Sequence, residues 1–544
     1  MEKSSKVFVR IKPFLSENIV TSVESTIVME SASYKKGDIF DVHPVFYAGC
    51  AMAGYTADDF QMQDDTGTFG FTCEDSMGDF GPQRTYRFDR DVTGRLVITY
   101  RTKTLEKNPN KADPGFSLFR TYGGYTASGL AFLVLPMKGE FEFSIEHDLS
   151  SFSSKAEAVC SYGKGNFIKC CDAKTLKETF YMVGNLKEFH REGSKLHIIW
   201  LADEIRMIDD FCRSMAELFD YTEKMFHDED IPYYIFLYPT PRTVATGTGL
   251  TRCCSFGFGD QLVDQIEEAE PIIAHELVHN WLIVSADREE EISLFAEGTA
   301  EFYSCYILFM VGKIDADRYV DMINEKLRAY YVNPYSKGDF SSAFRKSWTH
   351  CYAQRVTYGR GVLTLIELDA LLNRCTEGKV RMYNLMVELL DGAKEGIPMT
   401  WNRFVELADL YTAGKASLRL TELMEEGITA PAADFFGPEY TVEKVAAPVM
   451  DNGFDDTVRY SHDQVVTGVK PGSNAEKAGL RNGDVILKAS SEWEAVDDEN
   501  MHLVYQVRRG ETELTIEFLP RGEKVPCWQY VKCSAGGDCN TVSF

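Results

Sequence analysis

Apolar and polar residues alternate along the first part of the chain. Residues 95–100 and 140–145 show this alternation, and turn-forming residues recur between such runs. A repeat of two residues is typical of strands that have one buried face. We therefore expect residues 1–201 to form an all-β domain, which closes with the apolar run at 196–201.

The periodicity becomes helical after residue 202. Apolar side chains recur at helical spacing in residues 203–221, and from residue 297 to about 428 the patterns are almost all helical. Between these regions, residues 233–238 read as a strand, which we expect to be an edge strand beside a substrate cleft. The patterns predict a mixed domain at 202–340 with a helical extension at 341–430.

The C-terminal part has a different pattern. Residues 429–438 contain two prolines and a glycine and predict a linker. Residues 465–487 read as a strand, a Pro-Gly turn, a short helix, a glycine stop, an Asn-Gly turn and a second strand, and residues 512–519 would add a closing strand. This order resembles the core of a bacterial-type PDZ domain. The resemblance implies a PDZ domain at 445–522, followed by a tail at 523–544.

Two roles for this PDZ domain stay open. Such domains capture extended peptides by adding a strand and holding a C-terminal carboxylate. Gly453 and Phe454 could belong to the carboxylate-binding loop. Alternatively, the domain is a structural accessory that packs against the rest of the protein.

The segment from His275 to His279 carries the strongest chemical signal. It reads His-Glu-Leu-Val-His, and two histidines four residues apart on a helix point the same way and can share one metal ion. Pro271 stands where it could start that helix. Glu276 lies between the two histidines, where it could activate a water molecule. The pattern is typical of zinc hydrolases.

A catalytic zinc usually takes three protein ligands, so a further donor is expected. Glu297 is the best candidate, because it lies inside an apolar helical run where a carboxylate needs a partner. Glu301 follows one helical turn later. It suits an acceptor for the free ring nitrogen of a ligating histidine, or it is an ordinary, partly solvated helix position.

His275-Glu276-x-x-His279, seventeen further residues and then Glu297-Gly298 together resemble the gluzincin metallopeptidases. In aminopeptidases of that clan, a tyrosine in a Y-x-K-G motif follows about sixty residues later. Tyr358, 61 residues after Glu297, matches that tyrosine, and Arg360 replaces the lysine. The resemblance implies a thermolysin-like catalytic domain and one zinc ion per chain. It also implies that Tyr358 donates a hydrogen bond to the oxyanion of the tetrahedral intermediate.

One family element is altered. Gluzincin aminopeptidases carry a glutamate about two dozen residues before the first zinc histidine, and it holds the free ammonium of the substrate. Here the matching segment ends in Gly249, Leu250 and Thr251, so a hydroxyl stands where the carboxylate should be. A hydroxyl cannot supply that charge. The resemblance thus supports peptide hydrolysis more firmly than aminopeptidase specificity.

The overall composition adds few constraints. The chain has 544 residues, enough for several domains, and a formal net charge of −26, which argues against a nucleic-acid partner. We expect neither a signal peptide nor a membrane span, and therefore a cytoplasmic protein. Buried thiols in a reducing compartment fit Cys212, Cys305 and the adjacent pairs Cys170-Cys171 and Cys253-Cys254 better than disulfides do. Cys527, Cys533 and Cys539 could also pair or hold a second metal.

These observations predict a multidomain α+β protein with an N-terminal all-β domain, a thermolysin-like catalytic domain with a helical extension, and a C-terminal PDZ domain. That combination resembles the PDZ-bearing glycyl aminopeptidase family more than the larger aminopeptidases. The expected function is zinc-dependent hydrolysis of peptides or proteins, aminopeptidase-like with altered amine recognition. The alternatives are a zinc endopeptidase and a non-catalytic scaffold that binds peptides through the PDZ groove.

Overall fold

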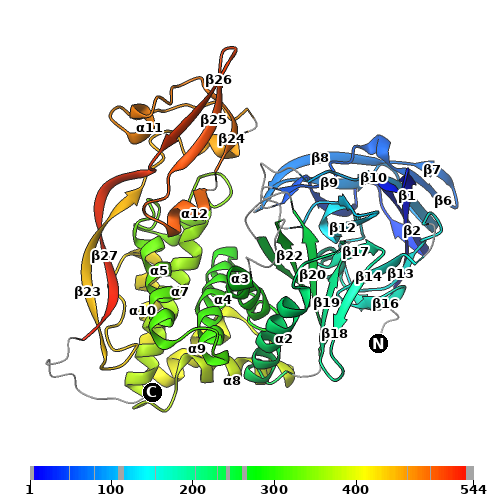
Figure 1. The fold of residues 1–544 in the computed structure, drawn as a ribbon. Coiled ribbons are helices and arrows are strands. Elements are labelled where there is room, and N and C mark those ends of the chain that lie inside the picture. The colour runs from blue at the N-terminus through cyan, green and yellow to red at the C-terminus, as the bar shows by residue number, and fades with distance from the viewer. Residues whose placement is uncertain are drawn as a thin grey trace. The chain divides into compact units, whose positions relative to one another are not determined.

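The computed structural model of the protein describes most of the chain, and Figure 1 shows its α+β architecture. The described residues are 5–47, 50–78, 80–107, 115–152, 155–202, 204–228, 231–240, 246–259, 266–461, 463–490 and 492–533. They divide into two compact units. Unit 1 holds the described residues up to Asp220 and those between Asp228 and Asn280, and unit 2 holds Tyr221–His227 and the described residues from Trp281 onward.

The N-terminal part of unit 1 consists mainly of strands, as predicted. Its largest sheet has the strand order β16 (Phe167–Cys171), β13 (Phe141–His147), β1 (Ser5–Ser16), β2 (Ile19–Tyr34), β10 (Val92–Lys103), β6 (Gln61–Asp64) and β7 (Gly67–Phe69). Strand β1 runs parallel to β13 and antiparallel to β2. Alternate residues of β1, namely Val7, Val9 and Ile11, are fully buried, which is the period-two pattern of a sheet with one face in the core.

Smaller sheets complete this β-rich part. One has the order β11 (Phe119–Thr121), β12 (Gly124–Ser128), β17 (Phe180–Gly184), β14 (Glu157–Cys160) and β15 (Gly163–Lys164), and another has β3 (Ile39–Pro44), β9 (Gly81–Phe88) and β8 (Phe71–Gly78). A hairpin of β4 (Phe46–Tyr47) and β5 (Cys50–Ala51) and the short helix α1 (Ala173–Lys177) accompany them. Buried residues from these sheets form one continuous apolar core.

A third sheet of unit 1 carries the segment that precedes the two histidines. Its order is β18 (Lys187–His190), β19 (Leu196–Trp200), β20 (Tyr233–Pro239), β22 (Cys253–Phe258) and β21 (Thr246–Leu250). The prediction that residues 233–238 form an edge strand is therefore wrong, because β20 lies between β19 and β22. All six of these residues are buried, as a central strand requires. The edge strand is the glycine-containing β21.

Two helices follow the predicted helical segments with shifted bounds. Helix α2 (Ile208–Met225) begins later than the apolar pattern at 203–221 suggests. Helix α3 (Ile266–Val278) contains Pro271 in its interior, so the prediction that Pro271 starts the helix is wrong. A proline there removes the hydrogen bond to the carbonyl of residue 267, which stands at an exposed position where water can replace it.

Unit 2 is mainly helical up to residue 425. Its helices are α4 (Glu289–Val311), α5 (Ala316–Tyr331), α6 (Phe340–Phe344), α7 (Arg355–Cys375), α8 (Met382–Lys394), α9 (Trp401–Thr412) and α10 (Lys415–Glu425). The long apolar helices α4 and α7 pack against each other. No helix in the described parts of the chain is long and apolar enough to cross a membrane.

The C-terminal part of unit 2 combines a long ribbon with a small domain. Strands β23 (Tyr440–Met450) and β27 (Arg521–Lys532) form the ribbon, and β24 (Val485–Ala489), β25 (Leu503–Arg509) and β26 (Thr512–Phe518) form a three-stranded sheet. The short helices α11 (Asn474–Lys477) and α12 (Glu492–Asp497) and the 3-10 turn η4 (Val458–Tyr460) complete this part. The turns, the short helix and the second strand of the small domain agree with the sequence. The strand predicted to begin at residue 465 is wrong, because only an isolated bridge joins Val465 to Val485 there. The ribbon was not predicted.

Several cysteines behave as the sequence predicts. Cys171, Cys212, Cys253, Cys254 and Cys305 are free, buried thiols, whereas the expectation of burial is wrong for Cys170, which is exposed. Burial raises the pKa of the thiol of Cys212 to about 12 and that of Cys305 to about 11, so both stay protonated at neutral pH. Cys539 lies outside the described residues.

Candidate active site

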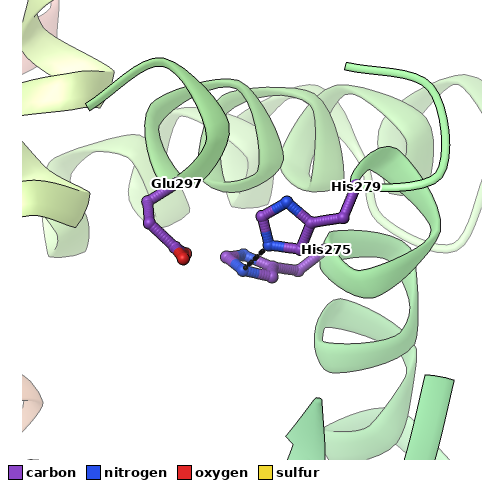
Figure 2. A group of neighbouring side chains, drawn as sticks. All are labelled: His275, His279 and Glu297. Carbon is purple, nitrogen blue, oxygen red and sulfur yellow. Dashed lines mark hydrogen bonds between the residues drawn. The ribbon is translucent and has the colours of Figure 1, made fainter. Parts of the chain in front are cut away.

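Helix α3 brings the two histidines to one place. His275 lies in its last turn and His279 directly follows its end. Four residues correspond to about one helical turn, so the two imidazoles stand on the same side. Their Nε2 atoms are 3.1 Å apart, and both rings are partly exposed (Figure 2). Two ring nitrogens this close are placed to share one ligand.

Glu297 of α4 supplies the third donor of the group. One ligand atom each of His275, His279 and Glu297 lies within 4.8 Å of the other two. Figure 2 shows the carboxylate of Glu297 directed toward the two rings. Among the described residues, no other set of three such side chains meets this condition. Two imidazoles and one carboxylate are a donor set that zinc hydrolases use, so these residues fit a zinc ion.

Glu276 lies between the two histidines in the sequence. Its side chain is buried, and 8% of the residue's surface is exposed. The hydroxyl of Tyr233 donates a hydrogen bond of 3.2 Å to its backbone carbonyl. Burial raises the pKa of Tyr233 and of the nearby thiol of Cys254 well above their usual values. Both groups therefore stay neutral and add no negative charge beside the carboxylate of Glu276.

Strand β21 approaches α3 through its glycines. A Cβ atom added to Gly249 would lie 2.7 Å from Oε2 of Glu276 and 3.3 Å from Cδ2 of His279. A Cβ atom on Gly247 would lie 2.6 Å from the Cγ2 atom of Ile272. A larger residue at either position would displace Glu276 or Ile272, so the glycines allow the backbone of β21 to lie beside the side chain of Glu276.

The other two residues of the expected substrate segment lie further along the hairpin. Leu250 is partly buried and packs against the apolar core. Thr251 and Arg252 form the two-residue turn between β21 and β22, and Arg252 has a positive φ of 56°. The amide of Thr251 donates to the carbonyl of Glu178 at 2.8 Å. Thr251 is thus a turn residue, and its role in binding substrate stays a prediction.

Glu301 of α4 forms an ion pair with Lys326 of α5. Burial by itself would lower the pKa of Lys326, but the charge of Glu301 outweighs it and raises that pKa above its usual value. Both side chains are mostly buried, so the pair keeps its charges at neutral pH. The expected contact of Glu301 with a ligating histidine stays a prediction.

Tyr358 lies in the first turn of α7 and is partly exposed. Helices α4 and α7 contact each other at two glycines. A Cβ atom added to Gly298 would lie only 2.7 Å from the Cα atom of Gly361. Gly298 directly follows Glu297, and Gly361 follows Tyr358 by three residues. The crossing therefore fixes the backbones that carry these two side chains. The available signal was a glycine inside each apolar helical pattern.

Arg360 is fully buried, with 0% exposure. Its guanidinium donates to three backbone carbonyls and one phenol, namely those of Ser336 (2.7 Å), Gly338 (3.0 Å), Met424 (3.1 Å) and Tyr330 (2.9 Å). These acceptors satisfy the charge without a carboxylate. Arg360 thus joins α7 to the segment after α5 and to the end of α10, a structural role that the motif comparison did not suggest.

Comparison with known proteins supports the architecture. Residues 465–492 match a model of the PDZ domain. No curated protein matches the chain by sequence. An aminopeptidase N family protein from Idiomarina loihiensis has a similar fold, with a TM-score of 0.65 and 13% identity over 96% of this chain and 98% of that one. At this identity the likeness concerns the fold, and it extends over nearly the whole of both chains.

Further similar structures include an M1 zinc metallopeptidase from Deinococcus radiodurans, with a TM-score of 0.48 and 12% identity over 79% of this chain and 94% of that one. A mutant of that enzyme, bound to a Tyr-Ser-Ala substrate, gives a TM-score of 0.47 and 13% identity over 79% of this chain and 95% of that one.

Proposed function

We propose that this protein is a zinc-dependent peptidase of the aminopeptidase type, with altered recognition of the substrate's amine. The observation that carries the proposal is the meeting of His275, His279 and Glu297 within 4.8 Å, beside the buried carboxylate of Glu276. Peptide binding alone requires none of these groups together, which argues against a purely non-catalytic scaffold. The aminopeptidase-type fold agrees with the proposal.

Each residue has a separate task in the proposed reaction. A zinc ion held by His275, His279 and Glu297 would supply a Lewis acid that polarises the scissile carbonyl. Glu276 accepts a proton from the attacking water and passes it to the leaving amine. Tyr358 donates a hydrogen bond from its phenol to the developing oxyanion. The same proposal includes Glu301 as an acceptor for the free ring nitrogen of a ligating histidine, and substrate contacts of Gly249, Leu250 and Thr251.

The proposed catalytic role of Glu276 is tested by Glu276→Gln. This variant should retain zinc and lose at least about 100-fold in turnover, the scale typical of a lost general base. Glu268→Gln removes the same charge from an exposed position of the same helix and should hydrolyse peptides as the wild type does. Wild-type turnover in Glu276→Gln would rule out this role.

Recognition of the substrate's amine separates an aminopeptidase from an endopeptidase. If Thr251 replaces the usual anchor and no other acid does, free and N-acetylated peptides should be cleaved at similar rates, because no buried carboxylate loses its partner. Glu301 and Asp260 are acids that could take over the anchor, but Glu301 is paired with Lys326, and Asp260 lies outside the described residues. Mass spectrometry of digests of matched peptides distinguishes these cases, and strict dependence on a free amine would contradict altered recognition.

A further inference from the structure

The PDZ domain expected at 445–522, here called the PDZ-type region, contacts the segment that leads directly into α7. The amide of Cys351 donates to the backbone carbonyl of Asp456 at 3.1 Å. The hydroxyl of Tyr352 donates to Oδ1 of Asn452, and Arg355 forms an ion pair with Asp497. The segment 351–355 is thus held at three residues, by the loop at 452–456 and by the end of α12. Tyr358 lies about one helical turn further along the chain.

Tyr352 is held in an unfavourable backbone conformation at this junction. Its φ of 67° lies in the left-handed region, which is costly for a bulky residue and persists only where the surroundings impose it. Its carbonyl accepts hydrogen bonds from the side chain of Asn333 at 2.7 Å and from the amide of Arg355 at 3.0 Å. Its side chain is buried, and its hydroxyl bonds to Asn452, which has no exposed surface. The contact with Asn452 therefore helps to set the direction in which α7 begins.

A second contact anchors the same loop. The hydroxyl of Tyr335 donates to Oδ2 of Asp456 at 2.6 Å, and the side chain of Asn452 donates to Oδ1 of the same carboxylate at 3.3 Å. Burial raises the pKa of Asp456, which is the expected result for a carboxyl group enclosed at an internal contact. The loop is thus bound from two sides by the helical part of unit 2.

At residues 451–454, at the start of this loop, contacts within the chain already involve groups that peptide capture would need. The amide of Gly453 donates to Oδ1 of Asp451 at 2.9 Å, and Lys470 bonds to the same oxygen at 2.6 Å. Phe454 is buried, with 1% exposure. In the described residues that follow it, the chain forms the 3-10 turn η4 and no strand before residue 464. If Gly453 belongs to a carboxylate-binding loop, its amide is thus already bound by a carboxylate of this chain.

We propose that Asn452, Asp456 and Asp497 are positioning residues that hold the first turn of α7, and with it Tyr358, in place. This inference rests on the proposed function of Tyr358 in peptide hydrolysis. The PDZ-type region then contributes to turnover through the helix and does not recruit substrate. Losing these contacts lets the phenol drift from its position, which lowers kcat and leaves KM unchanged, since misplacement of a catalytic group affects the chemical step.

Two variants test the proposal with little risk to folding. Asp497→Asn removes the charge from a half-exposed side chain, and Tyr352→Phe removes one hydroxyl. Each should lower kcat about 3- to 10-fold with KM and zinc content unchanged. The control is Asp434→Asn, which breaks the exposed ion pair with Arg374 at the other end of α7, about 24 Å from Tyr358. This variant should keep the wild-type kcat.

Hydrogen–deuterium exchange gives a readout that does not depend on activity. The amides of Arg355, Val356 and Thr357 bond to the carbonyls of Tyr352, Ala353 and Gln354, so they are protected only while this junction is held. Fragments covering 355–361 should exchange faster in Asp497→Asn and Tyr352→Phe than in the wild type or in Asp434→Asn. Unchanged exchange in the two variants would overturn the proposal about α7. This holds even if the wild type hydrolyses no peptide. Such inactivity would by itself reject the proposed function.

A double-mutant cycle checks that the effect acts through Tyr358. In a Tyr358→Phe background, Asp497→Asn should cause no further loss of kcat, because the group that it positions is already absent. A full additional loss would show that Asp497 acts by another route and would overturn the proposal. A change confined to KM, greater for peptides with a free C-terminus than for amidated ones, would instead establish peptide capture by the PDZ-type region.

Discussion

Helices α3 and α4 position their proposed ligands in different ways. In α3 the spacing alone does so, because residues 275 and 279 are separated by about one helical turn. In α4 a single carboxylate depends on how the helix packs, and the contact between Gly298 and Gly361 sets that packing. The first arrangement can be found in any sequence that contains the motif. The second becomes visible only when the partner helix is known.

This difference predicts different responses to substitution. A change of side chain on α3 should alter chemistry or metal binding and leave the fold intact. A small change of volume at the crossing of α4 and α7 should disturb the fold, and it should also shift Glu297 and Tyr358, which flank the two glycines.

The largest expected effect comes from Tyr358→Phe. Removing the phenol should lower turnover about 100-fold or more, as the loss of one oxyanion donor does, and zinc should remain bound because the three proposed ligands are untouched. Tyr411→Phe makes the same change on α9, where the hydroxyl donates to Glu388 at 2.7 Å, and should leave turnover unaltered. Equal turnover of the two variants would remove α7 from the proposed chemistry.

Next in size is the effect of filling the glycine crossing. Gly361→Ala would place a Cβ atom 2.4 Å from the Cα atom of Gly298, where neither backbone can yield without moving a helix. The expected loss is about 1–3 kcal/mol in the free energy of unfolding, measured by denaturant titration, together with a fall in turnover. Gly392→Ala is the control, because its Cβ atom would make only ordinary contacts at 3.8 Å in helix α8. It should be neutral or stabilise by up to about 1 kcal/mol.

A smaller expected effect is the pH dependence of stability, and it arises in the β-rich part of unit 1, not in the helices. His43 is fully buried, and burial, together with the charge of Lys177, holds its pKa well below 6.5. Asp41, Lys177 and Tyr55 surround it. The unfolded chain therefore binds a proton at residue 43 below about pH 6.5 that the folded chain rejects. Stability falls with falling pH, and His43 contributes about 2 kcal/mol of that fall at pH 5.

The histidine variants give this pH prediction its control. His43→Asn removes one buried histidine and should about halve the dependence of the unfolding free energy on pH between about 6.5 and 5, because burial also lowers the pKa of His147, to about 4. His502→Asn replaces a half-exposed histidine and should keep the wild-type slope. A slope in His43→Asn as steep as that of the wild type would show that His43 does not contribute to the acid sensitivity.

Patterns of local origin were predicted well from the sequence. The strands around 95–100 and 140–145, the apolar helix at 294–302 and the turns, helix and second strand of the PDZ-type order at 465–487 all depend on periodicity or turn residues that neighbouring positions display. The pairing of His275 with His279 belongs to the same group, because one helical turn separates them.

Features that depend on packing between distant segments were missed or wrong. The sequence of residues 233–238 cannot show which strands pair with this segment, so the prediction of an edge strand there is wrong. Pro271 is tolerated inside α3 because the carbonyl it leaves without a donor stands at an exposed position. The glycine crossing and the contacts of Asn452 and Asp456 join residues far apart in the chain. Local periodicity contains no information about such partners.

The most direct test of the central claim is the metal content of the purified protein. After expression with ample zinc, the wild type should contain about one zinc ion per chain, and His279→Ala should contain almost none, because two remaining donors hold the ion far more weakly. His502→Ala, which removes an exposed histidine elsewhere, should keep the wild-type content. A wild-type protein without zinc, or a His279→Ala variant that still binds a full equivalent, would contradict the account.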